Sequence, residues 1–210
     1  MSLILDRLMR KFPDLAECRE DIEQAFETLK KTYRGGGKLL VCGNGGSAAD
    51  SEHIVGELMK GFMSKRPLPD AEREAFSAVF PQDAGFLSDH LQGALPAISL
   101  VSQSALIAAV ANDVSPDMIF AQQVYGYGRP GDTLLGLSTS GNSANVVRAV
   151  QVAKVKGLHT IGLTGRGGGR LKEICDVTIR VPMDSTPDIQ ERHLPIYHAL
   201  CMMLEEEFFQ

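Results

Sequence analysis

Two short segments rich in glycine and serine constrain the fold of this chain more than any other feature. Residues 42–47 read CGNGGS and residues 138–143 read STSGNS, and each follows a short apolar run and leads into a segment with helical spacing. The sequence therefore predicts the same unit twice: a strand, a loop and a helix N-terminus. Exposed backbone N–H groups and the positive end of the helix dipole make such a junction an anion site.

The composition of the second loop narrows the kind of anion. Its STSG run supplies three hydroxyl side chains and a glycine, without lysine or arginine, which suits the phosphate of a small sugar. Neither loop ends in the GK[ST] of a P-loop, and no G-x-G-x-x-G follows a strand. Binding of a nucleoside triphosphate or a dinucleotide is therefore not indicated.

The overall composition excludes several partners. The 210 residues are 44% hydrophobic and 22% charged, as in an ordinary globular protein. A net charge of −5 without any Lys/Arg-rich run argues against nucleic acid. No apolar segment approaches the roughly 20 residues that cross a bilayer. The four cysteines are widely spaced without a CxxC, which predicts reduced thiols in a cytoplasmic protein.

Strand and helix patterns alternate along the chain. Two helices are expected over residues 1–34, the second from Pro13 to Tyr33, and a last helix from Ile189 to Phe208. The five strand candidates are residues 38–42, 97–100, 133–137, 160–164 and 177–181. This order predicts one α/β domain over residues 1–210: a three-layer, doubly wound, five-stranded parallel sheet of the flavodoxin-like kind with N-terminal helices. Ligands of such sheets bind at the carboxyl ends of the strands, where both loops fall.

Residues 67–96 interrupt this alternation. The stretch contains prolines, charges and a possible amphipathic helix over residues 87–95, and it is longer than a typical connection. It is either a surface excursion or a lid, and we favour the surface excursion.

A few side chains are candidates for chemistry. His53 and Glu57 project from one helix face, and Gln190 and His198 lie two turns apart on the last helix. Such residues can bind a metal or transfer protons, although on their own a solvated pair and a packed histidine are the commoner outcomes. His193 is assigned a structural role.

Three further motifs have competing interpretations. Cys42, before the first loop, is expected to be a buried packing residue rather than a nucleophile, because no local histidine and acid accompany it. Asn112 and Asp113 either cap a turn or face the cleft. Residues 165–169 read as a flexible connection rather than a third phosphate loop.

Several longer segments resemble the sugar-isomerase (SIS) fold and, more narrowly, the phosphoheptose isomerase family. The likeness covers most of the chain except residues 67–96. The segments that carry it are CGNGGSAADSEHIVGEL at 42–58, ANDVSPDMIFAQQV at 111–124, GDTLLGLSTSGNSANVVRA at 131–149, GLTGRGGGRL at 162–171 and IQERHLPIYH at 189–198.

The resemblance implies an activity and a site. It implies isomerisation of sedoheptulose 7-phosphate to D-glycero-D-manno-heptose 7-phosphate through an enediol, with Glu57 as base and His198 as partner acid/base. It also implies one zinc ion per subunit and a homotetramer with sites between subunits. The implied metal ligands are His53, Glu57, Gln190 and His198. The implied substrate-site residues are Asn44, Gly45, Gly46, Ser47, Glu57, Asn112, Asp113, Ser138, Thr139, Ser140, Ser143 and Gln190.

The chain departs from the family pattern in three places. Gly61 stands where the family has an arginine, and Lys60 is one position, roughly 100°, around the helix from it. The excursion is about twenty residues longer than the family's linker. Pro195 is expected to kink the last helix between two of the implied ligands.

Two other functions compete with this assignment. One is isomerisation of a different sugar phosphate by the same residues, and the other is a non-catalytic SIS protein that binds a phosphosugar or a partner protein. Retention of both the His53/Glu57 pair and the Gln190/His198 pair favours an enzyme.

Overall fold

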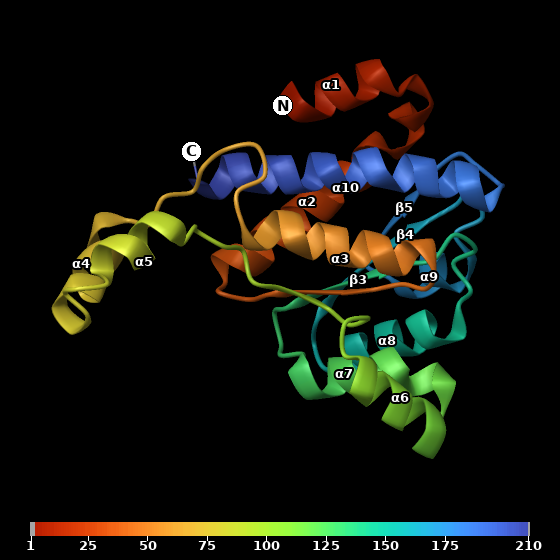
Figure 1. Ribbon diagram of the computed structural model, residues 1–210. Coiled ribbons are helices and arrows are strands. Elements are labelled where there is room, and N and C mark those ends of the chain that lie inside the picture. Colours follow the sequence, from red (N-terminus) through yellow and green to blue (C-terminus); the bar gives the residue numbers. More distant parts are fainter. Residues whose placement is uncertain (1–2, 210) are drawn as a thin grey trace.

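The computed structural model describes residues 3–209 (Figure 1). Seventeen elements follow one another along this part of the chain. In order they are α1 Leu3–Lys11, η1 Pro13–Cys18, α2 Arg19–Arg34, β1 Leu39–Cys42, α3 Gly46–Met59, α4 Asp70–Val79, α5 Ala84–His90, β2 Ala97–Ser99, α6 Ser104–Asp113, η2 Pro116–Met118, α7 Ile119–Tyr127, β3 Thr133–Leu137, α8 Ala144–Val155, β4 His159–Thr164, α9 Gly169–Ile174, β5 Val177–Arg180 and α10 Thr186–Phe209.

The strands form one five-stranded parallel sheet in the order β2-β1-β3-β4-β5, which confirms the predicted α/β class. β1 pairs with β2 on one side, from Leu39 opposite Ala97, and with β3 on the other, from Leu39 opposite Thr133. The strand order therefore changes direction at β1: β2 lies on one side of it, and β3, β4 and β5 follow on the other. Both glycine loops follow these neighbouring strands, because one comes directly after β1 and the other directly after β3.

Helices cover both faces of the sheet (Figure 1). Alternate residues of β1 point to opposite faces, so Leu39 and Val41 join the core under α2, α3 and α10. Leu40 and Cys42 join the second core, under α7, α8 and α9. Because every residue of β1 is buried, the strand reads as a continuous apolar run rather than an alternating one.

The N-terminal segment differs slightly from the prediction. The second predicted helix begins as the 3₁₀ helix η1 at Pro13 and continues as α2 from Arg19. Proline has no N–H to donate and its φ suits a first helical position, which explains the start at Pro13.

The excursion over residues 67–96 contains two helices rather than the single one predicted over residues 87–95. Helix α5 ends at His90, and α4 has no predicted counterpart. No residue of α4 is buried, and the helix packs on α5 rather than in the core of the domain. Backbone and side-chain hydrogen bonds close the base of the excursion, from Gly93 N to the Arg66 carbonyl (2.7 Å) and from Gly61 N to Gln92 Oε1 (2.7 Å).

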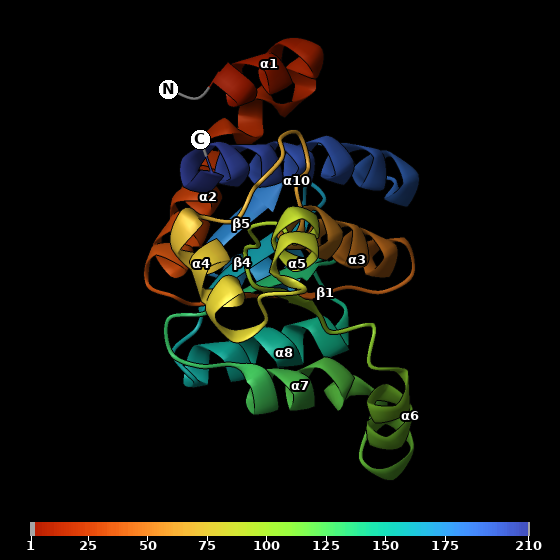
Figure 2. The same cartoon turned by 60° about the vertical axis from the view of Figure 1, so that its left-hand side comes forward.

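The excursion does not cover the glycine loops of its own chain. Figures 1 and 2 show α4 and α5 beside the C-terminal ends of α3 and α10, whereas the loops lie at the N-terminal ends of α3 and α8. Within one chain the surface interpretation therefore holds.

The last helix is continuous. α10 runs for 24 residues and passes through Pro195 without a break. Its predicted start at Ile189 is three residues late. Among the described residues, no helix is long and apolar enough to cross a membrane.

Candidate active site

A cavity of about 340 Å³ opens between the two glycine loops. It lies at the carboxyl ends of β1 and β3 and at the N-termini of α3 and α8, as the sequence predicted. Eight of the predicted substrate residues line it, together with two residues that sequence reasoning missed. The predicted ones are Asn44, Gly45, Gly46, Ser47, Ser138, Thr139, Ser143 and Gln190, and the others are Leu137 and Thr186.

The cavity is polar but contains no charged side chain. Ser138 Oγ and Ser143 Oγ lie 2.9 Å apart, and neither hydroxyl caps a helix. Asn44 and Asn145 exchange two side-chain hydrogen bonds of 2.9 and 3.0 Å, which join the loops. Two helix N-termini and a pair of hydroxyls therefore face one space, an arrangement suited to a phosphate group.

The third glycine-rich turn, residues 165–169, packs against the second glycine loop, residues 138–143. Gly141 has φ +67°, and a Cβ there would lie 2.0 Å from the Gly168 carbonyl oxygen. Asn142 Oδ1 accepts from the backbone N–H of Arg170 at 3.0 Å. The interpretation of residues 165–169 as a flexible connection is thus wrong, because the turn packs on the loop backbone.

Four predicted substrate residues lie away from this cavity: Glu57, which belongs to the cluster described below, and Ser140, Asn112 and Asp113. Ser140 is exposed, and its hydroxyl accepts from the backbone N–H of Asn142 at 3.2 Å. Asn112 and Asp113 are exposed at the end of α6, where the Asn112 amide donates to Asp113 at 2.8 Å. Figure 1 shows α6 on the side of the sheet opposite α3 and α10.

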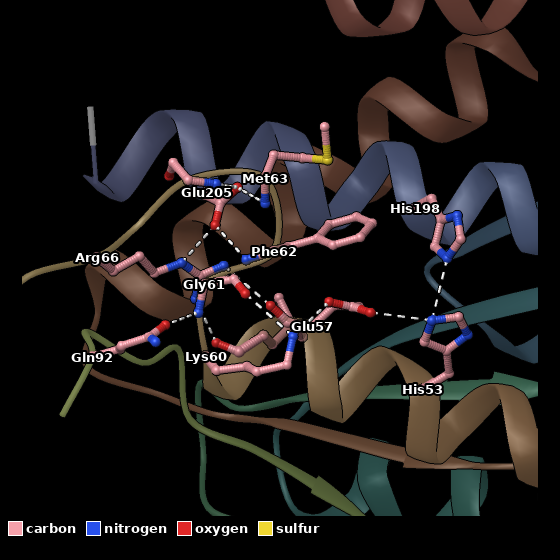
Figure 3. Close-up of polar contacts among 12 residues, drawn as sticks. His53, Glu57, Lys60, Gly61, Phe62, Met63, Arg66, Gln92, His198 and Glu205 are labelled. Atoms are coloured by element: carbon pink, nitrogen blue, oxygen red, sulfur yellow. Dashed lines mark hydrogen bonds and ion pairs between the residues drawn. The ribbon is translucent and has the colours of Figure 1, made fainter. Parts of the chain in front are cut away.

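The predicted acid/base residues form a cluster where α3 packs on α10. His53 Nε2 lies 3.2 Å from Glu57 Oε1 and 3.4 Å from His198 Nε2 (Figure 3). The first pair is one turn apart on α3, and His198 comes from α10. Gln190, the fourth predicted metal ligand, lies instead against Gly46, where an added Cβ would be 2.6 Å from its Nε2.

Two residues that sequence reasoning missed orient the His53 ring. Tyr197 is buried, and its hydroxyl donates to Asp50 Oδ1 at 3.1 Å. Because this uses its only proton, the hydroxyl oxygen accepts from His53 Nδ1, 3.1 Å away. His53 Nε2 then faces Glu57 and His198. Asp50 was detectable, since it precedes His53 and Glu57 by three and seven residues on the same helical face.

The cluster therefore directs two imidazole nitrogens and a carboxylate oxygen at one another. A cation between them relieves this arrangement, and tetrahedral zinc with bonds of about 2.0–2.1 Å holds its ligand atoms about 3.4 Å apart. The spacing around His53 fits that value. Among residues 3–209, however, no three histidine, cysteine or acidic side chains already surround a single point.

The surroundings of His198 keep its imidazole uncharged at neutral pH. Burial lowers its pKa below 6.5, the neighbouring His53 lowers it further, and Glu57 partly offsets both. The Phe62 ring lies against it, with centroids 5.3 Å apart. An uncharged imidazole can accept a proton, as a partner acid/base must.

Lys60 occupies the space beside the proposed base. Its Nζ lies 3.3 Å from Glu57 Oε2 and 3.2 Å from the Gly61 carbonyl oxygen. The Lys60 side chain is 59% exposed, so solvent screens its ion pair with Glu57. Although one position separates Lys60 from the family's arginine, its flexible stem reaches the Glu57 carboxylate.

Two residues have the packing roles assigned to them. Cys42 is fully buried, and burial raises the pKa of its thiol far above the usual range, so it is no nucleophile. His193 is also fully buried, and burial lowers its pKa to about 4.

Comparison with known proteins identifies the family of this chain. The SIS domain family model matches residues 6–79 and 76–165. The fold and the cavity between two loops thus define a protein of the SIS domain family. The phosphoheptose isomerase of Rhodospirillum rubrum is 40% identical over 195 residues, which cover 93% of this chain and 90% of that protein. That of Akkermansia muciniphila is 39% identical over 198 residues, covering 94% and 91%.

A solved structure extends the likeness to the backbone. The structure of a phosphoheptose isomerase from Francisella tularensis superimposes with a TM-score of 0.74 at 31% identity, covering 98% of this chain and 100% of that one. The chain belongs to the phosphoheptose isomerase family, and it is an isomerase.

Proposed function

We propose that this chain converts sedoheptulose 7-phosphate into D-glycero-D-manno-heptose 7-phosphate. The observation that carries the proposal is the placement of the loop cavity and an acid/base cluster along one pair of helices. Gln190 at the cavity and His198 at the cluster are eight residues, about 12 Å, apart on α10. An extended seven-carbon sugar phosphate can reach from one to the other.

The reaction moves a proton between adjacent carbons. Glu57 removes a proton from C1 of the ketose, which produces an enediol, and C2 then receives a proton to give the aldose. His198, uncharged at neutral pH, returns or relays a proton on the opposite side of the reacting atoms. The Tyr197–Asp50 pair holds the His53 ring and therefore keeps the cluster oriented.

The phosphate is held at the other end of the site. The hydroxyls of Ser138 and Ser143 and the first backbone N–H groups of α3 and α8 donate to it. Because these donors are far from the reacting carbons, they contribute mainly to substrate binding, whereas Glu57 and His198 contribute to turnover.

One zinc ion per subunit is part of the proposal. Within one chain its ligands would be His53, Glu57 and His198, whose mixed nitrogen and oxygen donors suit zinc. Gln190, the fourth ligand that the resemblance implied, lies against Gly46 at the cavity and does not join them. When bound, zinc would polarise the substrate oxygens. Metal analysis of the purified protein, with His53→Ala for comparison, tests this: the variant is expected to lose most of the metal.

We further propose a cytoplasmic homotetramer in which the whole chain acts as one domain. Asn112 and Asp113 support this assembly, since they lie on α6, away from their own cavity, and could reach substrate only in a neighbouring subunit. Light scattering should give about four times the 22.7 kDa of one chain. A monomer of full activity would contradict a site shared between subunits.

A direct assay tests the reaction itself. The purified chain is incubated with sedoheptulose 7-phosphate, and formation of the aldose is followed by NMR, with ketose phosphates of five and six carbons in parallel. We expect turnover of the seven-carbon substrate. Turnover of a shorter ketose phosphate alone would assign a different isomerase, and absence of all turnover would favour a binding protein.

A further inference from the structure

A buried ion pair lies beside the acid/base cluster and has no part in the proposed chemistry. Arg66 follows α3 in the chain, and Glu205 is on α10, 139 residues later. Each residue is only 1% exposed, and Arg66 Nε donates to Glu205 Oε1 at 2.8 Å (Figure 3). Burying two charges costs desolvation free energy, and apolar residues of similar volume often make a folded protein equally stable. This pair therefore calls for another explanation.

Two further donors of Arg66 cap the C-terminal end of α3, the helix that carries the proposed base Glu57. Nη1 donates to the Leu58 carbonyl oxygen at 2.8 Å, and Nη2 donates to the Glu57 carbonyl oxygen at 3.1 Å. The last carbonyls of a helix have no partner within the helix. One guanidinium thus caps α3 at Glu57 itself and links it to α10.

Glu205 organises the segment after α3. Its carboxylate accepts from the backbone N–H groups of Phe62 (2.8 Å), Met63 (2.8 Å) and Ser64 (3.2 Å). Although burial alone would raise the pKa of Glu205, these N–H donors and Arg66 lower it, so the carboxylate stays charged. The same segment places the Phe62 ring against His198.

We infer that Arg66 and Glu205 are positioning residues that hold Glu57 opposite His198 for proton transfer. Arg66 fixes the backbone of the base, and Glu205 fixes the ring that packs on its partner. The inference rests on the proposed function, since it assigns Glu57 and His198 to that reaction. A displacement of about 1 Å at a reacting group can lower a rate about 100-fold, so a rigid support here affects turnover.

The test compares Glu205→Gln with a matched control in a second buried carboxylate network. The Asp132 carboxylate is also buried and accepts from two backbone N–H groups, those of Lys38 and Arg129, both at 2.9 Å. It also accepts from Lys38 Nζ at 2.6 Å. Asp132 immediately precedes β3, and its hydrogen-bond partners Lys38 and Arg129 are not on α3 or α10. Asp132→Asn therefore weakens a similar network without touching the site.

We expect both variants to lower the melting temperature, but only Glu205→Gln to lower kcat. The expected loss is about 10- to 100-fold in kcat, with KM within about twofold of the parent, because the phosphate cavity is unchanged. Asp132→Asn should keep kcat within about twofold. If the folded Glu205→Gln protein keeps the kcat of Asp132→Asn, the inference is overturned.

A double variant covers the case in which Glu205→Gln does not fold, since that change leaves a buried arginine unpaired. Arg66→Met/Glu205→Leu removes both charges and keeps an apolar core. It should fold and show the same loss in kcat. Parental kcat in this folded variant would show that the pair positions nothing.

Crystal structures separate this inference from the reaction assigned above. If the parent does not isomerise sedoheptulose 7-phosphate, the proposed function fails, and the structures then decide the inference. A Glu57 carboxylate displaced by about 1 Å or more from His53 in either Glu205 variant supports it, and an unmoved carboxylate overturns it.

Discussion

The two ends of α3 differ in the chemistry of the side chains that surround them. At the N-terminal end, Gly46 and its neighbours face a cavity lined by hydroxyls, amides and glycines, without any charged side chain. At the C-terminal end, charges gather: Glu57 faces His53 and Lys60, and the buried Arg66–Glu205 pair lies behind it. The first end is suited to holding an anion and the second to moving a proton.

The ends also differ in how far apart their parts lie in the sequence. Each loop at the N-terminal end is a contiguous run, so the motif itself brings its donors together. The C-terminal end joins α3 to α10, with His53 and His198 separated by 145 residues. Local backbone geometry therefore builds the anion site, whereas helix packing builds the acid/base site.

The largest effect is expected from the charged end. Glu57→Gln keeps the shape of the side chain but removes the base, so kcat should fall by roughly 10²–10⁴-fold with little change in KM. Glu52→Gln is the control, because Glu52 is on the same helix but contacts Ser102 at 2.9 Å. Steady-state kinetics and zinc content are measured on both variants and on the parent. A folded, metal-loaded Glu57→Gln protein with parental turnover would falsify the assignment of the base.

The backbone geometry of the neutral end can be broken by one methyl group. Gly141→Ala places a Cβ 2.0 Å from the Gly168 carbonyl oxygen at φ +67°, so it should cost at least about 2 kcal/mol of unfolding free energy. Gly56→Ala, in the interior of α3 with no atom within 4 Å, should instead stabilise by about 0.5–1 kcal/mol. Urea denaturation measures both, and equal stabilities would refute the role of the Gly141 contact.

A single hydroxyl at the neutral end should affect binding only. Ser143→Ala removes one donor to the phosphate, so KM should rise about 10-fold with kcat nearly constant. Ser140→Ala is the control from the same loop, since Ser140 does not line the cavity and its KM should stay within about twofold. Equal effects of the two changes would mean that the phosphate lies elsewhere on the loop.

The smallest effect concerns pH and the buried pair at the charged end. The pKa of Glu205 is below its usual 4.5 in the folded protein, so its contribution to stability is complete above about pH 4.5. That contribution is lost as the pH falls through the folded pKa. The stability difference between the parent and Glu205→Gln should therefore shrink in acid. Denaturation curves from pH 7 to pH 3 that keep a constant difference would contradict this account.

Much of the fold was readable from the sequence. Short apolar runs before two glycine loops indicated the parallel sheet. The register, with Leu39 opposite Thr133, came from the structure, because a strand buried on both faces has no alternating pattern that fixes its pairing. The position of the loop cavity could also be predicted, because the carboxyl ends of neighbouring parallel strands lie at the same edge of the sheet. Helix α4 was not predicted: it packs on α5, outside the two cores on the faces of the sheet.

The sequence by itself determined the sheet, the two anion-binding loops and the residue types available for proton transfer, because each depends on local spacing. Only the tertiary structure decided which of these residues meet. It placed His198 beside His53, left Gln190 against Gly46, and put Asn112 and Asp113 on the far side of the sheet. It also buried Arg66 against Glu205. Contacts between distant helices depend on how whole faces pack, and no short stretch of sequence contains that information.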